Sequence, residues 1–212
     1  MSHSALLVGA TGLVGSALLK RLLDSPHYAR VEAWVRRPIA VSHPKLATEV
    51  IDFERLAERR VAAEDVYCAL GTTIRTAGSQ DAFRHVDFDF PVALAQAAAR
   101  GGAQRILVVS SLGANPRSGA FYGRVKGEME EGVRIAGVPK ALFFRPSLLA
   151  GERSEFRPGE RIGLLVGLVL GPLLGRYRPI HAELVAAAML RAAERDLPAG
   201  VLDSGRIREL AG

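Results

Sequence analysis

Side chains that could carry out proton and hydride transfer lie close together in the middle of the sequence. Ser110 and Ser111 end an apolar run, and Tyr122 and Lys126 follow four residues apart. On a helix, residues four apart share a face, so the Lys126 ammonium would lie beside the Tyr122 phenol. A nearby positive charge lowers the pKa of a tyrosine, which makes proton transfer easier at neutral pH. We therefore predict that Ser111, Tyr122 and Lys126 are catalytic and act on a carbonyl or an alcohol.

Each of these assignments has a structural alternative. A tyrosine and a lysine at this spacing often occur by chance, with the ring packed on a sheet and the ammonium in water. Ser111 is the first candidate for orienting the substrate, and Ser110 is the second candidate and a predicted cofactor contact. One of the two serines could simply cap the strand end, and the sequence does not separate them.

A glycine-rich turn near the N-terminus predicts the cofactor that this chemistry needs. Gly9, Gly12 and Gly15 separate a short apolar run from a stretch of helical periodicity at 16–23. In a dinucleotide site the first glycine permits the turn, the second lets a pyrophosphate approach the backbone, and the third lets the helix pack on the strand. The helix N-terminus then faces the phosphates. The predicted phosphate-binding residues are Gly9, Ala10, Thr11, Gly12, Leu13, Val14 and Gly15; a purely structural turn is the alternative.

The end of the second predicted strand, 31–35, predicts which dinucleotide binds. An acidic residue at this position suits the free ribose hydroxyl of NAD, whereas an arginine suits the 2′-phosphate of NADP. Arg36 and Arg37 follow the strand, and no acid follows Trp34. We therefore expect NADP rather than NAD, with two solvated surface arginines as the alternative.

Two further strand ends are expected beside the adenosine. Asp52 follows a strand at 47–51 and could meet the adenine amine, with the Phe53 backbone against the ring; Asp52 could equally cap a helix at 54–60. A buried strand that begins at Asp65 ends in four residues expected along the adenosine and ribose, which are Ala69, Leu70, Gly71 and Thr72. The composition of 72–79 is that of a loop.

The alternation of strands and helices predicts an α/β fold, namely a Rossmann-type, doubly wound parallel sheet. Further strands are expected at 104–111 and 140–144 and an edge strand at 201–203, with helices at 121–135 and from His181 onward, where His181 would be a cap. Pro91 should kink or break the helix predicted over 81–100. Residues 1–212 are expected to form a single domain, in which 145–180 contribute a small lid on the substrate side.

Composition limits the remaining possibilities. The chain has 212 residues and a net charge of +6, with basic residues scattered among acids, so no nucleic-acid partner is expected. The single cysteine, Cys68, lies in an apolar run and is expected to be buried, and no residue cluster has metal-ligand spacing. The N-terminus does not resemble a signal peptide, which predicts a cytoplasmic location.

One apolar stretch, 162–174, carries a glycine at every fourth position but is too short to cross a membrane. We expect it to pack under the lid or at a subunit contact, with contact to a membrane surface as the alternative. A homodimer or another protein partner therefore remains open.

These motifs together resemble the atypical, epimerase/dehydratase-like part of the short-chain dehydrogenase/reductase superfamily. The similar segments are GATGLVG at 9–15, SSLGA at 110–114 and YGRVKGE at 122–128. Within that part, CALGTT at 68–73, AGS at 77–79, VD at 86–87 and RPSLLAGER at 145–153 resemble the Tat-interacting-protein branch.

The resemblance implies a Rossmann fold, NADP(H) binding and the family's catalytic roles for Ser111, Tyr122 and Lys126. It also implies that Pro146, Ser147 and Leu148 lie along the nicotinamide. Asp87 stands where many members have an asparagine that helps a proton relay. The chain also lacks the long C-terminal substrate domain of sugar-nucleotide epimerases, so nucleotide-sugar chemistry is not expected.

Two functions are consistent with these residues. The first is an NADP(H)-dependent oxidoreductase that transfers hydride between nicotinamide and a small carbonyl or alcohol substrate. Arg153, in a charged loop at 153–161, could hold an anionic substrate group, although a solvated arginine is the alternative. The second function is an NADP(H)-sensing regulatory protein with little or no turnover, which would bind a protein partner. The sequence does not identify the substrate.

Overall fold

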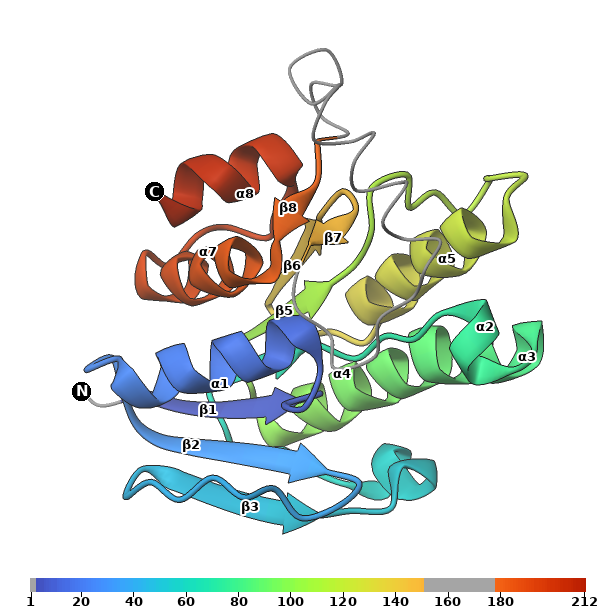
Figure 1. Ribbon diagram of the computed structural model, residues 1–212. Helices are drawn as coiled ribbons and strands as arrows, with labels where there is room; N and C mark the ends of the chain where they lie inside the picture. The colour runs from blue at the N-terminus through green and yellow to red at the C-terminus, as the bar shows by residue number, and fades with distance from the viewer. Residues whose placement is uncertain (1–2, 151–177) are drawn as a thin grey trace.

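The computed structural model describes residues 3–150 and 178–212, and its centre is a seven-stranded sheet in which all strands are parallel. The strand order is β3-β2-β1-β4-β5-β6-β9, so the chain moves outward from β1 and then returns to its other side at β4 (Figure 1). This confirms the predicted Rossmann-type, doubly wound fold. The strands are β1 (His3–Val8), β2 (Tyr28–Val35), β3 (Leu46–Val50), β4 (Asp65–Cys68), β5 (Arg105–Val109), β6 (Lys140–Arg145) and β9 (Gly200–Asp203).

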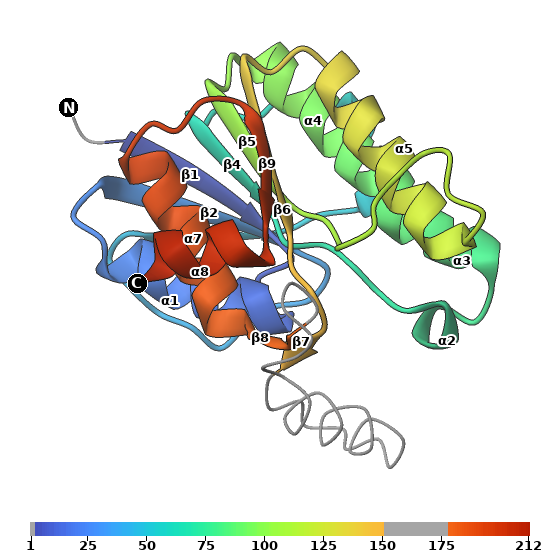
Figure 2. The same ribbon diagram turned by 90° about the horizontal axis from the view of Figure 1, so that it is seen from above.

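Helices cover both faces of the sheet (Figure 2). Because side chains alternate along a strand, Leu7 and Leu107 pack in one core while Leu6 and Ile106 pack in the other. All four of these side chains are buried. One core lies under α1 (Leu13–Asp24), α7 (Ala182–Glu194) and α8 (Ser204–Ala211), and the other lies under the 3₁₀ helix η1 (Phe53–Glu58), α4 (Phe90–Gly101) and α5 (Phe121–Ile135).

The predicted helix over 81–100 is interrupted by a π-helical turn rather than by a sharp kink. It consists of α3 (Gln80–Arg84), the π turn η2 (His85–Asp89) and α4. The Phe90 N–H donates to the carbonyl of His85, five residues back. Pro91 has no N–H to donate and its ring would crowd the carbonyl four residues back, so a widened turn just before it relieves the conflict. The turn leaves Asp87 buried against α5.

The segment that was expected to be a loop, 72–79, contains a short helix, α2 (Ile74–Ala77). The side chain of Thr73 caps it by accepting a hydrogen bond from the backbone of Thr76 at 3.1 Å. Loop composition did not reveal this helix because a single turn has too few residues to show periodicity.

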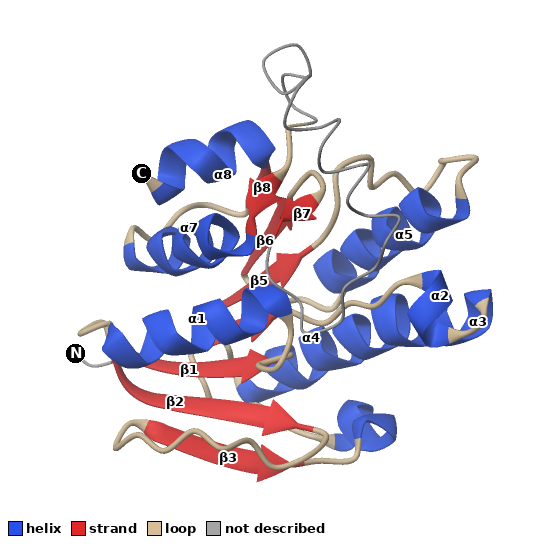
Figure 3. Ribbon diagram, in the orientation of Figure 1, coloured by secondary structure: helices blue, strands red, loops and turns tan. Residues whose placement is uncertain are grey.

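Only the two ends of the predicted lid fall within the described residues. Strand β7 (Leu149–Ala150) pairs in parallel with β8 (Ile180–His181), beside the main sheet (Figure 3). Arg153 and the glycine-spaced stretch at 162–174 lie outside the described residues. His181 occupies the N-cap position of α7, as predicted, although its side chain makes no capping hydrogen bond.

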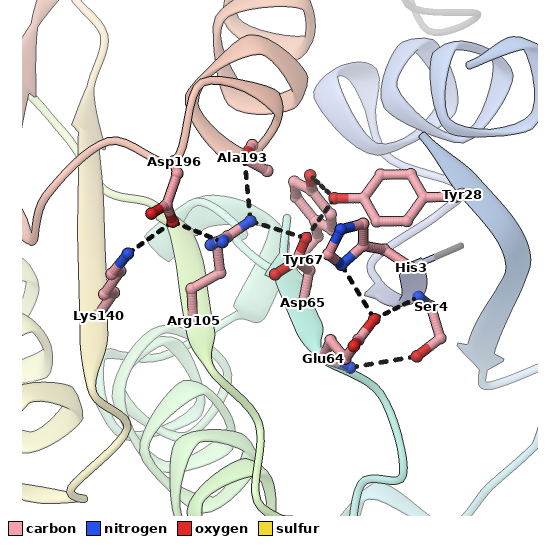
Figure 4. A network of polar contacts seen from close by, with 10 residues as sticks. All are labelled: His3, Ser4, Tyr28, Glu64, Asp65, Tyr67, Arg105, Lys140, Ala193 and Asp196. Atoms are coloured by element: carbon pink, nitrogen blue, oxygen red, sulfur yellow. Dashed lines mark hydrogen bonds and ion pairs between the residues drawn. The ribbon is translucent and has the colours of Figure 1, made fainter. Parts of the chain in front are cut away.

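A polar network connects the C-terminal end of α7 to the edge where the strands begin (Figure 4). The buried Asp65 carboxylate accepts hydrogen bonds from Tyr28 at 2.6 Å and from Arg105 at 3.1 Å. Arg105 also donates to the carbonyl of Ala193 at 3.0 Å and to Asp196 at 2.7 Å. Burial raises the pKa of Asp65, and the Tyr28 hydrogen bond and the Arg105 charge oppose that rise. The network holds the C-terminal end of α7 on the sheet edge opposite the glycine turn.

Candidate functional site

The structure requires glycine at the first and third positions of the turn after β1. Gly9 has a φ of +90°, and a Cβ there would lie 2.5 Å from the carbonyl oxygen of Ala69. A Cβ on Gly15 would lie 1.9 Å from the carbonyl oxygen of Gly9. These two glycines therefore let the turn, the end of β4 and helix α1 approach one another.

Gly12 differs, because no contact among the described residues demands a glycine there. Its backbone has a φ of −78° and a ψ of 171°, which other residues adopt readily, and a Cβ would lie no closer than 3.4 Å to the carbonyl oxygen of Gly9. Gly12 and Thr11 are exposed, whereas Ala10 and Val14 are buried and Leu13 is half-buried. The exposed backbone at Gly12 fits a ligand that approaches the chain closely.

The start of α1 adds a favourable environment for an anion. Gly12 is the N-cap and offers no side-chain capping bond, and the first turn contains no acidic residue. The first N–H groups of a helix have no partner within the helix and carry a partial positive charge. A pyrophosphate could therefore accept these hydrogen bonds, which is the fit that NAD(P) requires.

The residues expected near the adenosine lie at the same edge of the sheet. Arg36 and Arg37 follow β2 and are exposed, and neither guanidinium makes a hydrogen bond or ion pair with any described residue. Asp52 caps η1, because its carboxylate accepts from the backbone of Glu54 at 3.0 Å; this confirms the N-cap interpretation. The Phe53 ring is buried in the core, so only its backbone is left for a ligand.

The turn after β4 lies between the glycine turn and the catalytic candidates. The Ala69 N–H donates to the carbonyl of Val8 at 2.8 Å, which aligns the ends of β4 and β1. Leu70 is half-buried and Gly71 is exposed. The Thr72 N–H donates to the Asp87 carboxylate at 2.8 Å. A hydrogen bond to Asp87, a residue of the π turn η2, thus holds the turn after β4 in place.

Tyr122 and Lys126 occupy one end of α5 in contrasting environments. Tyr122 is 39% exposed, and its ring centre lies 5.3 Å from that of Phe83. Lys126 is buried, and its ammonium lies 2.7 Å from the Asp87 carboxylate. Burial lowers the pKa of Lys126, but the electrostatic interaction with Asp87 foremost, and then with Tyr122, more than offsets this effect, so the pKa is raised overall. The lysine is therefore a buried, charged group and not a solvated surface residue.

The two serines after β5 have different partners. Ser110 is buried, and its hydroxyl donates to Glu130 at 2.5 Å. Glu130 is itself buried and accepts two hydrogen bonds from Arg145 at 2.7 and 2.8 Å. Ser111 is half-buried, and among the described residues its hydroxyl bonds only the carbonyl of Leu112, at 3.3 Å. Ser110 therefore belongs to a structural cluster, while the Ser111 hydroxyl is free to exchange its weak local bond for a ligand.

Two glycines of α5 bring the loop after Ser111 onto this helix. A Cβ on Gly127 would lie 2.2 Å from the nitrogen of Pro116, and one on Gly123 would lie 2.9 Å from the carbonyl oxygen of Gly113. The loop backbone therefore lies directly on the helix that carries Tyr122 and Lys126. The four-residue spacing of the two glycines is the sequence signal from which this contact could have been predicted.

The residues expected along the nicotinamide continue from β6. The Pro146 carbonyl accepts from the Leu112 N–H at 2.9 Å, which places it beside the loop of Ser111. The Ser147 N–H donates to the Ser204 hydroxyl at 2.6 Å, and the Ser147 hydroxyl donates to the Arg178 carbonyl at 2.5 Å. Ser147 is thus occupied by structural bonds, whereas Leu148 is 56% exposed.

The site as a whole lies at the carboxyl edge of the parallel sheet, where the strand order reverses between β1 and β4. Figure 1 shows α1 beginning at the arrowhead of β1. Open α/β sheets bind ligands at this position. Glu130, Arg145 and Asp87 are the functional neighbours whose contacts sequence reasoning missed. Within residues 3–150 and 178–212, no three His, Cys, Asp or Glu side chains are grouped as a metal site, and no helix could span a membrane.

Comparison with known proteins agrees with this geometry. Residues 9–136 match a family model described as NAD(P)H-binding. The chain is 34% identical over 210 residues to protein fmp52, mitochondrial, of Aspergillus clavatus, which covers 92% of this chain and 90% of the relative. It is 37% identical over 165 residues to protein HTATIP2 of Rattus norvegicus, which covers 75% of this chain and 68% of the relative.

Solved structures share the fold at low sequence identity. MoeE5 in complex with UDP-glucose and NAD has a TM-score of 0.71 and 20% identity, covering 94% of this chain and 75% of that protein. The human epimerase family protein SDR39U1 with NADPH has a TM-score of 0.66 and 18% identity, covering 94% and 72%. One of these proteins holds NAD and the other NADPH.

The comparisons correct one expectation. The predicted cytoplasmic location is wrong on this comparison, because the FMP52 relatives are named mitochondrial, which points away from a purely cytoplasmic location. The prediction rested on the lack of a secretory signal, and that lack does not distinguish the cytosol from an organelle.

The glycine turn and the doubly wound sheet thus agree with the match to an NAD(P)H-binding family model. The chain belongs to the NAD(P)H-binding family and is related to protein HTATIP2 and the FMP52 proteins, which agrees with its resemblance to the atypical short-chain dehydrogenases/reductases.

Proposed function

We propose that the protein is an NADP(H)-dependent oxidoreductase that transfers hydride between nicotinamide and a small carbonyl or alcohol. The observation that supports this most is the placement of Tyr122. Its ring is exposed, it lies one helical turn from a buried, charged Lys126, and the loop of Ser111 packs on the same helix. A binding protein without chemistry has no need for this combination beside a dinucleotide turn.

The proposed roles follow from the chemistry of each side chain. In reduction, the bound cofactor supplies a hydride to the carbonyl carbon. The Tyr122 phenol donates a proton to the carbonyl oxygen, and in the reverse direction its phenolate accepts that proton from the alcohol. The Ser111 hydroxyl donates a hydrogen bond to the same oxygen and orients it. Lys126 stabilises the phenolate by its charge.

Turnover with wild type and matched variants tests the reaction. NADPH oxidation is measured across a panel of aldehydes, ketones and quinones. Tyr122→Phe should lower kcat at least about 100-fold while leaving NADP binding intact, because only the proton donor is lost. Ser111→Ala should lower kcat, whereas Ser110→Ala should lower stability, since its hydroxyl bonds Glu130. A Tyr122→Phe variant that turns over a genuine substrate as fast as the parent refutes the mechanism.

The preference for NADP over NAD is part of the proposal. Arg36 and Arg37 are exposed at the end of β2 and free of partners among the described residues, so they can fork onto a 2′-phosphate. Arg36→Ala should weaken NADP binding about tenfold or more in calorimetry and should change NAD binding little. Arg30→Ala, at the other end of the same strand, is the matched control. Equal losses for both cofactors would contradict the preference.

We further propose that the chain, 1–212, acts as a single domain whose substrate side is formed by 145–180. Pro146 and Leu148 would line the nicotinamide side, and Arg153 would hold an anionic group of the substrate. If this is correct, Arg153→Ala raises KM for anionic substrates and leaves KM for neutral ones unchanged. A KM that rises equally for both classes would rule out this role.

A further inference from the structure

The Lys126 ammonium is paired with a carboxylate that the proposed mechanism does not use. Its nitrogen lies 2.7 Å from an oxygen of Asp87, and the two side chains are 4% and 1% exposed. A buried charge is tolerated when it is paired and hydrogen-bonded, and it loses its charge when it is alone. The pair therefore determines whether the lysine carries a charge in the site.

Among the described residues, Asp87 is the only carboxylate within ion-pair distance of Lys126. The other groups that raise its pKa are Tyr122, on its own helix, and Cys68, at the end of β4. Neither of these two side chains is a carboxylate. Burial raises the pKa of the Cys68 thiol to about 11, so this group is neutral at pH 7. The charge of Lys126 at neutral pH is thus balanced by Asp87 alone among these neighbours.

The second oxygen of Asp87 connects the pair to the cofactor side of the site. It accepts a hydrogen bond from the Thr72 N–H at 2.8 Å. A Cβ on the exposed Gly71 would lie 3.5 Å from the Asp87 carboxylate and 3.9 Å from the Lys126 nitrogen. One carboxylate therefore holds both the ammonium and the turn under which the ammonium lies.

We propose that Asp87 is a positioning residue for Lys126, which keeps the ammonium charged and holds it beneath the Gly71–Thr72 turn, where the ribose of the cofactor is expected. The proposal rests on the proposed function for its consequence in catalysis. Asp87 lies in the π turn before Pro91, so the carboxylate that pairs with Lys126 comes from the widened part of this helix. Lysine then enters the site as one half of an ion pair and not as an isolated cation.

Direct titration of the lysines tests this without any substrate. The chain has four lysines, Lys20, Lys45, Lys126 and Lys140, so protein labelled with ¹³C at lysine Cε gives few NMR signals, and Lys126→Met identifies one of them. In the wild type, Lys126 should titrate above the ordinary lysine range. In Asp87→Asn its titration should fall by about one unit or more, because burial then acts without a counter-charge.

A matched variant and a binding measurement separate positioning from general damage. Asp89→Asn removes an exposed carboxylate from the same π turn, where it bonds His85, and should leave the Lys126 titration unchanged. In Asp87→Asn, NADP affinity should fall as the pH rises through the lowered pKa of Lys126, whereas wild-type affinity should stay constant over that range. A merely structural role lowers affinity equally at every pH.

Three results would overturn the proposal. The first is a Lys126 titration that is the same in Asp87→Asn and the wild type. The second is a wild-type protein in which no lysine signal titrates above the ordinary range, a measurement that needs no variant. The third is an NADP affinity of Asp87→Asn that does not change with pH. Because the lysine titration uses the ligand-free protein, an inactive enzyme would refute the proposed function and leave the test of Asp87 intact.

Discussion

Replacing Gly12 with alanine should separate cofactor binding from folding. The backbone at Gly12 suits alanine, and the new Cβ would lie 3.4 Å from the Gly9 oxygen and 3.8 Å from the Ala69 oxygen. Alanine is a poorer N-cap than glycine by about 0.5–1 kcal/mol. The reduced entropy of the unfolded chain offsets this by about 0.4–1 kcal/mol. The free energy of unfolding of Gly12→Ala should therefore stay close to that of the wild type.

Binding should change much more, because the methyl group occupies the space where the pyrophosphate approaches. We expect at least about a tenfold loss of NADP affinity, or about 1.4 kcal/mol. At an NADP concentration 100 times the wild-type Kd, the cofactor stabilises the wild type by about 2.7 kcal/mol and the variant by about 1.4 kcal/mol. Calorimetry measures the affinity, and urea denaturation with and without NADP measures the stabilisation.

Gly15→Ala is the contrasting variant. Its Cβ would lie 1.9 Å from the Gly9 oxygen, so the helix must shift, which should destabilise the fold by about 1–3 kcal/mol or more even without cofactor. The reasoning about the turn is refuted if Gly12→Ala binds NADP as tightly as the wild type. It is also refuted if Gly12→Ala unfolds as easily as Gly15→Ala in the absence of NADP.

Two further predictions concern stability and reactivity. Glu130→Gln should lower the free energy of unfolding, measured by urea denaturation, by about 3 kcal/mol. This is the lower end for a broken buried ion pair, because the partner Arg145 is 27% exposed. Glu58→Gln, which breaks an exposed pair, should cost at most about 0.5 kcal/mol; similar losses would show that burial does not set the cost. Cys68 should not react with a thiol reagent at pH 8 in the folded protein, because it is fully buried and its pKa is raised to about 11, so the thiol stays protonated below that pH. Fast reaction at pH 8 without unfolding would contradict the burial.

The sequence predicted best what depends on local periodicity. The helix expected at 121–135 has those bounds in the structure, and the edge strand expected at 201–203 is β9. The glycine turn was also predictable, because Gly9 and Gly15 are required by close backbone contacts that any such strand-turn-helix unit makes. These features follow from short stretches of chain, in which the spacing of apolar residues and glycines carries the information.

Contacts between distant segments were not predictable in the same way. Asp87 was noted only as a departure from the family pattern, because nothing in one sequence shows that a π turn aims its carboxylate at Lys126. Glu130 reads as a surface residue of an amphipathic helix, yet it is buried by Ser110 and Arg145 from neighbouring strands. Such pairs depend on sheet order, which single-sequence periodicity does not encode.

The small pairing of β7 with β8 has a consequence for how this protein could be varied. Leu149 lies opposite Ile180 and Ala150 opposite His181, so the chain enters and leaves the stretch between them at neighbouring points of the backbone. Replacement of residues 151–177 by segments of other lengths therefore has two fixed junctions, because the described residues on either side of the replaced segment are paired with each other. Chimeras joined at Ala150 and Arg178 would test whether residues 151–177 determine substrate preference, as we propose, while the described cofactor site is left unchanged.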